Sequence, residues 1–165
     1  MSKTIKDLEK QRAEFAFECV ERDIWNPYVN LKQELQNIDC KDNNLSEELK
    51  EKCKRKKQLR KQADEYKSYV KKIPAMIQTN GLGATLAFMY SKKKTYEIIY
   101  KQIDEWLKKE RKLKDNSDEL VKWVIHLDSS KYKHITNEVI ALFLWLRRFA
   151  EGMIEKEEDG KEKEE

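Results

Sequence analysis

Apolar residues recur three or four positions apart along most of the chain, and this spacing predicts amphipathic helices. A first helix is expected over residues 4–24, where the stretch "WNPY" interrupts the pattern. Asn26 suits an N-cap and Pro27 suits the first helical position. A second helix is therefore expected to begin there and to bury Leu31 and Leu35.

A long basic helix is expected next. Asn44 and Glu47 have the spacing of a capping box, which marks its beginning. Ile73 precedes Pro74 and is steered away from helical dihedral angles, so the helix should end or kink there. One or two further turns follow, and Gly81 then supplies the left-handed residue that ends them.

The second half of the chain continues the helical pattern. A short apolar helix is expected over residues 82–90, another over 96–113, a third capped by Ser117, and a last one from Ser129 or Ser130. The last contains "VIALFLWL", which is apolar on every side and typical of a helix touched all round by neighbours. The sequence thus predicts an all-α, single-domain bundle of about six to eight helices with a central apolar C-terminal helix.

Three of the few backbone breakers, Pro74, Gly81 and Gly83, stand close together. The stretch "NGLGAT" has glycines like those of a phosphate-binding loop. Such a loop follows a buried strand and carries a lysine or a third glycine at a fixed offset. Here the preceding segment is helical and the lysine is missing. We therefore expect a tight corner between two helices.

Composition agrees with long helices in one domain. The chain has 165 residues, 40% of them charged, with only four glycines and two prolines to make turns. Residues 1–154 are expected to form one α-helical domain. The N-terminus is charged, and the longest apolar run, residues 139–146, is too short to span a bilayer. We expect no membrane contact and a cytoplasmic location.

Charge is unevenly distributed. Residues 155–165 hold seven acids and three lysines, which is typical of an acidic disordered tail. Residues 50–72 hold eleven Lys or Arg residues and only three acids. The part of the chain before this tail is therefore basic, which favours an acidic partner. Nucleic acid is the first candidate.

The three cysteines, Cys19, Cys40 and Cys53, form no CxxC pair. An odd, unpatterned set suits a reducing compartment and argues against a disulfide framework. Zinc sites show paired ligands at short spacing, which are missing here. We expect no metal site and no cofactor.

The stretch "HLDSSKYKH" brings His126 and His134 close in sequence. Two histidines can serve as acid and base in RNA cleavage, so a small ribonuclease is one alternative. Asp128, Ser129 and Ser130 are also good helix caps, which explains most of the cluster without catalysis. No nucleophile, base and orienting group occur together, and we expect no enzyme.

Three stretches together are similar to a known family. They are "RAEFAFECV" (residues 12–20), "YKSYVKKIPAMIQTNGLGATLAF" (66–88) and "YKHITNEVIALFLWLRRFAEGMI" (132–154). In this order they resemble the small, all-helical subunit of the type III-B CRISPR effector, the Cmr complex. Residues 23–61 depart from the family pattern and are expected to form an insertion-like basic helical region.

The resemblance implies a non-catalytic structural subunit of prokaryotic antiviral defence. Several copies would stack on one another beside the larger RAMP subunits and line the channel for the guide RNA–target RNA duplex. A-form duplexes are recognised largely through shape and phosphates. Cations in or beside the resembling segments are therefore the candidate RNA contacts. They are Lys67, Lys71, Lys72, Arg147 and Arg148.

Two rival interpretations remain besides the scaffold. One is the ribonuclease that would use His126 and His134. The other is a homo-oligomeric helical adaptor without RNA contact. Arg147 and Arg148 can also pair with acids of their own helix, such as Glu138 or Glu151, instead of facing RNA.

Overall fold

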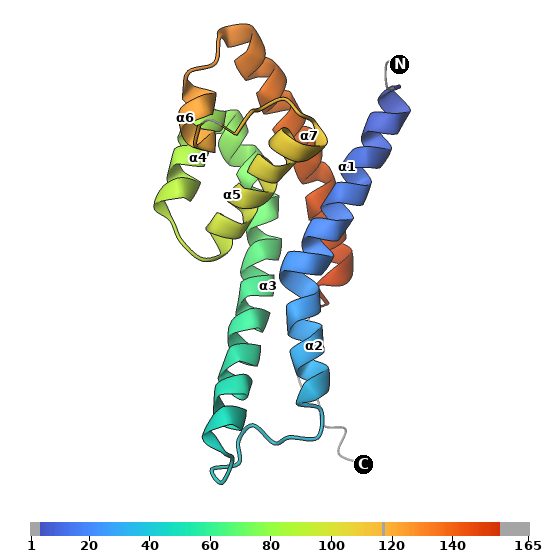
Figure 1. The fold of residues 1–165 in the computed structure, drawn as a ribbon, viewed down its shortest axis with the longest axis vertical. Coiled ribbons are helices and arrows are strands. Elements are labelled where there is room, and N and C mark those ends of the chain that lie inside the picture. The colour runs from blue at the N-terminus through green and yellow to red at the C-terminus, as the bar shows by residue number, and fades with distance from the viewer. Residues whose placement is uncertain (1–3, 117, 156–165) are drawn as a thin grey trace.

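The structure is a computed structural model that describes residues 4–116 and 118–155. Within these ranges it has seven α-helices, two π-helical turns and no strand, so the predicted all-α class is confirmed (Figure 1). The elements are α1 (Ile5–Val20), η1 (Glu21–Trp25), α2 (Asn26–Glu34), α3 (Glu47–Asn80), α4 (Leu82–Ser91), α5 (Thr95–Glu105), η2 (Trp106–Glu110), α6 (Leu120–Ile125) and α7 (Ser129–Met153). The predicted acidic tail, beyond its first residue, lies outside the described residues.

Helix α7 lies between α1 and α3 and makes its largest contacts with these two helices (Figure 1). Its buried face carries Val139, Leu142, Phe143 and Leu146, so the predicted central apolar helix is confirmed. The expectation that neighbours surround it on every side is wrong at Leu144, whose side chain is 54% exposed. One stripe of the helix thus reaches the surface, because α1 and α3 cover only the opposite side.

The chain enters α2 without the predicted interruption. The stretch that contains "WNPY" continues as the π-helical turn η1, in which the Asn26 N–H donates to the carbonyl of Glu21. Asn26 has helical dihedral angles and does not cap α2. Pro27 is tolerated because it falls in the first turn of α2, where its missing N–H costs little.

Helix α3 is longer than the sequence predicted. It begins after Ser46, whose hydroxyl accepts a hydrogen bond from the Leu49 N–H at 3.3 Å, and not at the predicted capping box. It also runs through Pro74, so the expected end or break is wrong. An internal proline costs about 3 kcal/mol. Ile73 and Ile77 are buried on either side of it, and each contributes about 1.5–3 kcal/mol by burial.

The glycine stretch forms the predicted corner between α3 and α4. Gly81 has φ +86°, a backbone conformation that favours glycine. The Gly83 N–H donates to the Tyr132 hydroxyl of α7 at 2.9 Å. A Cβ atom at Gly81 would meet the same hydroxyl at 3.1 Å. The two glycines therefore let the corner approach α7 closely.

A buried ion-pair network ties the N- and C-terminal helices together. Glu138 of α7 is 3% exposed. Its carboxylate accepts hydrogen bonds from Arg12 of α1, at 2.8 and 3.2 Å, and from the Trp106 indole at 3.1 Å. The Arg111 guanidinium lies 3.2 Å from the same carboxylate. Glu138 is therefore engaged in the interior and is not a partner of Arg147 or Arg148.

Helix α2 and the first half of α3 form a two-helix stem below the main bundle (Figure 1). Its buried residues Tyr28, Leu35 and Leu59 lie outside the main core cluster. Arg60 packs over the Tyr28 ring at 5.6 Å and over the Trp25 ring at 5.7 Å. The stem thus has its own small core, with an arginine as part of it.

A disulfide joins Cys40, in the loop after α2, to Cys53 of α3, with 5.7 Å between the Cα atoms. The expectation of unpaired cysteines is therefore wrong for this pair. The 13-residue spacing gives no hint of it, since only the return of the chain at the end of the stem brings the two together. Cys19 is a free, buried thiol, and burial raises its pKa well above the ordinary value.

Replacing Glu138 with Ala should lower the free energy of unfolding by about 3–5 kcal/mol, because Arg12 and Arg111 would be left without their buried counter-charge. Chemical denaturation of the purified chain measures the change. Glu14→Gln, on the exposed face of α1, serves as the control and should stay within about 0.5 kcal/mol of wild type. An effect of Glu138→Ala no larger than that of the control would contradict the network's role.

Breaking the disulfide should destabilise the stem. The double variant Cys40→Ser, Cys53→Ser should lose about 3 kcal/mol, the value typical of a loop of this size. Thermal unfolding with and without a thiol reductant checks this. Reductant should lower the melting temperature of wild type and leave that of the double variant unchanged, and an equal response in both would rule out the bond.

Candidate nucleic-acid interface

Four exposed lysines share one face of α3. Lys54, Lys57, Lys61 and Lys72 follow one another at helical spacing, over about 27 Å of helix axis. We call this row the lysine stripe. Lys61 lies 4.0 Å from Glu65, whereas none of the other three forms an ion pair with an acid in residues 4–116 or 118–155. The stripe therefore presents mostly unneutralised positive charge.

The connection between α4 and α5 adds a second group of cations. Lys92, Lys93 and Lys94 are consecutive and exposed, and we call them the lysine loop. Lys94 has φ +65°, a conformation that is costly for a lysine. A groove of about 410 Å³ separates this loop from α3. It is lined by Arg55, Gln58, Lys61, Gln62, Glu65, Lys94 and Thr95.

Aromatic rings accompany these cations. Tyr69 of α3 stacks on Tyr96 of α5 at 4.0 Å, and Phe88 of α4 meets Tyr96 edge-on at 5.3 Å. The Lys92 amine lies 5.4 Å above the Phe88 ring. Burial, followed by the charge of Glu65, raises the pKa of Tyr69, which therefore stays a neutral hydroxyl. Basic groups interleaved with aromatic rings are typical of surfaces that bind nucleic acid.

The lysine loop is not among the RNA contacts predicted from the sequence. The sequence does contain a feature that could have indicated it, because "SKKKTYE" has three consecutive lysines followed closely by an aromatic residue. The run could not be placed, since nothing in the sequence indicates that α5 packs beside the basic part of α3. The groove is a product of the tertiary arrangement.

The three predicted contacts on α3 fall on two sides of that helix. Lys72 belongs to the lysine stripe. The amine of Lys67 is half-buried and donates to the Ile154 carbonyl at 2.9 Å. A cation in this position caps the C-terminal end of α7 and complements its dipole.

Lys71 and Arg147 meet at one carboxylate. Glu151 lies 3.1 Å from the Lys71 amine and 3.5 Å from the Arg147 guanidinium. Hydrogen bonding from Lys71 first, and from Arg147 to a lesser degree, lowers the pKa of Glu151. The cluster keeps one net positive charge. Arg148 is exposed on the same helix, with its guanidinium 5.1 Å from the Trp145 ring.

The two histidines are both exposed. His126 ends α6, where its Nδ1 lies 2.7 Å from the Lys122 carbonyl oxygen, and His134 lies on α7. Asp128 caps α7 by accepting a hydrogen bond from the Lys131 N–H at 2.9 Å, as the capping interpretation expected. Ser117, which was expected to cap the preceding helix, lies outside the described residues.

Neither a metal site nor a membrane span emerges from the described chain. No group of three or more His, Cys, Asp or Glu side chains in residues 4–116 and 118–155 is placed to hold a metal ion. Within the same residues, no helix is both long and apolar enough to cross a membrane. The surface features that stand out among the described residues are exposed cations and aromatic rings.

Comparison with known proteins decides the family. A family model described as "CRISPR-associated protein (Cas_Cmr5)" matches residues 41–153, well over half of the chain. The chain belongs to this family. It is therefore a subunit of the CRISPR Cmr complex and associates with other Cmr subunits, and the resemblance to the small Cmr subunit is confirmed.

A solved structure agrees with this assignment at the level of the fold. It is the crystal structure of a CRISPR-associated Cmr5 family protein from Thermus thermophilus. The TM-score is 0.57 at 21% sequence identity, and the match covers 93% of this chain and 100% of that one. The similarity extends over nearly the whole chain, so the Cmr5 fold includes most of the described helices.

Proposed function

We propose that this Cmr5 family member is a non-catalytic structural subunit of the Cmr ribonucleoprotein. It stacks on copies of itself beside the RAMP subunits and lines the channel in which guide and target RNA pair. The observation that carries the proposal is the lysine stripe together with the lysine loop. All seven lysines are exposed, and the groove between the two groups is lined by Lys61 of the stripe and Lys94 of the loop.

The arrangement of the lysines suits contacts with phosphates and does not suit recognition of base sequence. A straight helix that presents cations over about 27 Å can follow several phosphates of one strand. Lysines are compact charges with flexible stems, so they hold a backbone without reading bases. Lys72 is the sequence-predicted residue that we assign to RNA first, whereas Arg148 belongs to the aromatic face of α1 and α7 described below. Lys71 and Arg147 contribute the net charge of their cluster with Glu151, and Lys67 acts mainly as a cap.

A second surface supports association with neighbouring subunits. Phe17 of α1 is 43% exposed and meets Phe149 of α7 edge-on at 5.3 Å. Phe149 stacks in turn near Trp145 at 5.9 Å. Exposed aromatic rings beside Arg148 are typical of protein–protein contacts. This face lies on α1 and α7, whereas the lysine stripe lies on α3, so one subunit can meet protein and RNA simultaneously.

Reversing three charges of the stripe should weaken RNA binding for all sequences alike. The variant Lys54→Glu, Lys57→Glu, Lys61→Glu should bind an RNA duplex at least about tenfold more weakly near 0.1 M salt. The slope of log affinity against log salt should become shallower by about 2, since fewer counterions are released. Fluorescence anisotropy over a salt series measures both quantities.

The matched control reverses three lysines elsewhere. Lys6, Lys10 and Lys133 are exposed on α1 and α7, and their change to Glu gives the same net charge. Equal loss in both variants would mean that only net charge matters. A change in sequence preference would mean that the stripe does not act through phosphates. Normal target capture by a Cmr complex that carries the stripe variant would favour an adaptor without RNA contact.

The isolated chain should not cleave RNA. Labelled single-stranded RNA incubated with the purified chain, with and without a chelator, should stay intact, because no contact of the described residues places a nucleophile beside either histidine. Cleavage that disappears in His126→Ala or His134→Ala would overturn the scaffold proposal in favour of the ribonuclease.

A further inference from the structure

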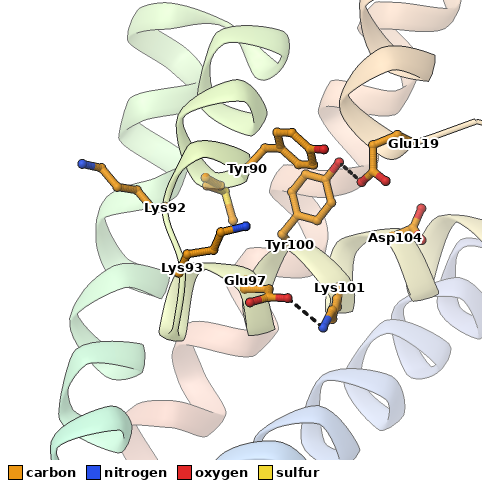
Figure 2. Close-up of a pocket in the computed structure, with 9 residues that line it drawn as sticks. Tyr90, Lys92, Lys93, Glu97, Tyr100, Lys101, Asp104 and Glu119 are labelled. Atoms are coloured by element: carbon orange, nitrogen blue, oxygen red, sulfur yellow. Dashed lines mark hydrogen bonds and ion pairs between the residues drawn. The ribbon is translucent and has the colours of Figure 1, made fainter.

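A pocket of about 290 Å³ opens between α4, α5 and the residue before α6 (Figure 2). Its aromatic wall consists of Tyr90 and Tyr100, whose ring centroids are 5.8 Å apart. Tyr90 is 54% exposed, whereas Tyr100 is buried. The volume is near the lower limit for small-molecule sites, roughly 300 Å³, and so suits one planar group. Tyr90 thus has a ring face on which such a group can stack.

A carboxylate lies beside this wall. The Tyr100 hydroxyl donates to Glu119 at 2.6 Å and accepts from the Val121 N–H at 3.0 Å (Figure 2). Burial and the Glu119 carboxylate raise the pKa of Tyr100, so its proton stays in this bond. The bond holds Glu119 in place, and a carboxylate has further lone pairs on both oxygens. Glu119 can therefore accept hydrogen bonds from a ligand.

The remaining charges of the pocket divide into engaged and available groups. Glu97 pairs with Lys101 at 3.0 Å, and Asp104 pairs with Lys108 at 2.8 Å. Lys93 makes no ion pair with a described acid, and its amine lies across the pocket from Glu119 (Figure 2). The Lys93 amine thus stands opposite the Glu119 carboxylate, with the aromatic wall between them.

We propose that this pocket binds an unpaired nucleotide of RNA and prefers guanine. The base would stack on Tyr90, its donor edge would face Glu119, and its phosphate would meet Lys93. Guanine presents adjacent N1–H and N2–H donors, which match the acceptors of a carboxylate. Uracil presents one N–H between two carbonyl oxygens, which the carboxylate repels. Splayed bases read in this way are the usual route to sequence preference in RNA recognition.

The inference rests on the proposed function, because RNA held by the lysine stripe would bring nucleotides to this surface. The lysine loop links the two sites, since Lys92 and Lys93 line the pocket and Lys94 lines the groove. A strand that follows the stripe can therefore continue into the pocket. The stripe would bind all sequences alike, whereas the pocket would add a preference at one unpaired position.

The test titrates GMP and UMP into the isotope-labelled full chain and follows amide chemical shifts. GMP should perturb residues around Tyr90, Tyr100 and Glu119, and should bind more tightly than UMP by roughly tenfold. Glu119→Gln should remove most of this preference, because an amide cannot accept at both positions. Lys93→Ala should weaken GMP binding without weakening guanosine binding. Glu14→Gln, on α1, is the matched control and should change nothing.

Equal binding of GMP and UMP, shifts outside the pocket, or an unchanged preference in Glu119→Gln would overturn the inference. Tyr90→Ala provides a second variant that should fold normally, since the ring is exposed, and it should weaken all mononucleotides. The stripe variant separates this inference from the proposed function. If that variant loses duplex binding while the wild-type chain shows no binding of GMP, the inference about the pocket is wrong and the proposed function stands. If GMP binds as expected and charge reversal in the stripe leaves duplex binding unchanged, the role of the lysine stripe is wrong and the inference about the pocket stands.

Discussion

Helix α7 buries its apolar face against α1 on one side and α3 on the other, and it also buries the carboxylate of Glu138. Its carboxylate meets Arg12 from α1 and Arg111 from the end of η2, so three distant parts of the chain share one buried charge. Such a pair contributes little net stability when intact, but its position is specified tightly because a shift would leave a charge unpaired. The contact therefore fixes how α7 lies against α1 and against the end of η2.

The packing of α3 against α7 decides which cations reach the surface. The side of α3 that meets α7 has its charges engaged, as with Lys67 at the end of α7 and Lys71 at Glu151. The opposite side has the lysine stripe and faces away from the apolar interior. The helix thus separates structural cations from available ones. Under the proposed function, this separation would allow one subunit to be both a rigid element of an assembly and a surface for a polyanion.

The two proposed RNA contacts differ in their chemistry. Lysines at helical spacing act through charge, which is the same at every nucleotide, and they are therefore sensitive to salt and insensitive to sequence. The pocket beside Tyr90 and Glu119 has a shape and a hydrogen-bonding pattern, which differ from base to base. If the subunit lines a channel for many guides, as proposed, it needs the first property throughout, and it can carry the second only where a base is unpaired.

The sequence by itself determined the all-α class, the central C-terminal helix, the corner at Gly81 and the family. Each of these depends on the local spacing of residues or on a contiguous motif. Local rules failed where a distant partner outweighed them. Burial of Ile73 and Ile77 kept α3 intact through Pro74, and the π-helical turn η1 joined α1 to α2 without a break before Pro27. The disulfide, the Glu138 network and the groove beside the lysine loop were decided only by the tertiary structure. Periodicity shows that one face of a helix is buried, but it does not show which helix packs against that face. The partner of each charged residue depends on which helices pack together.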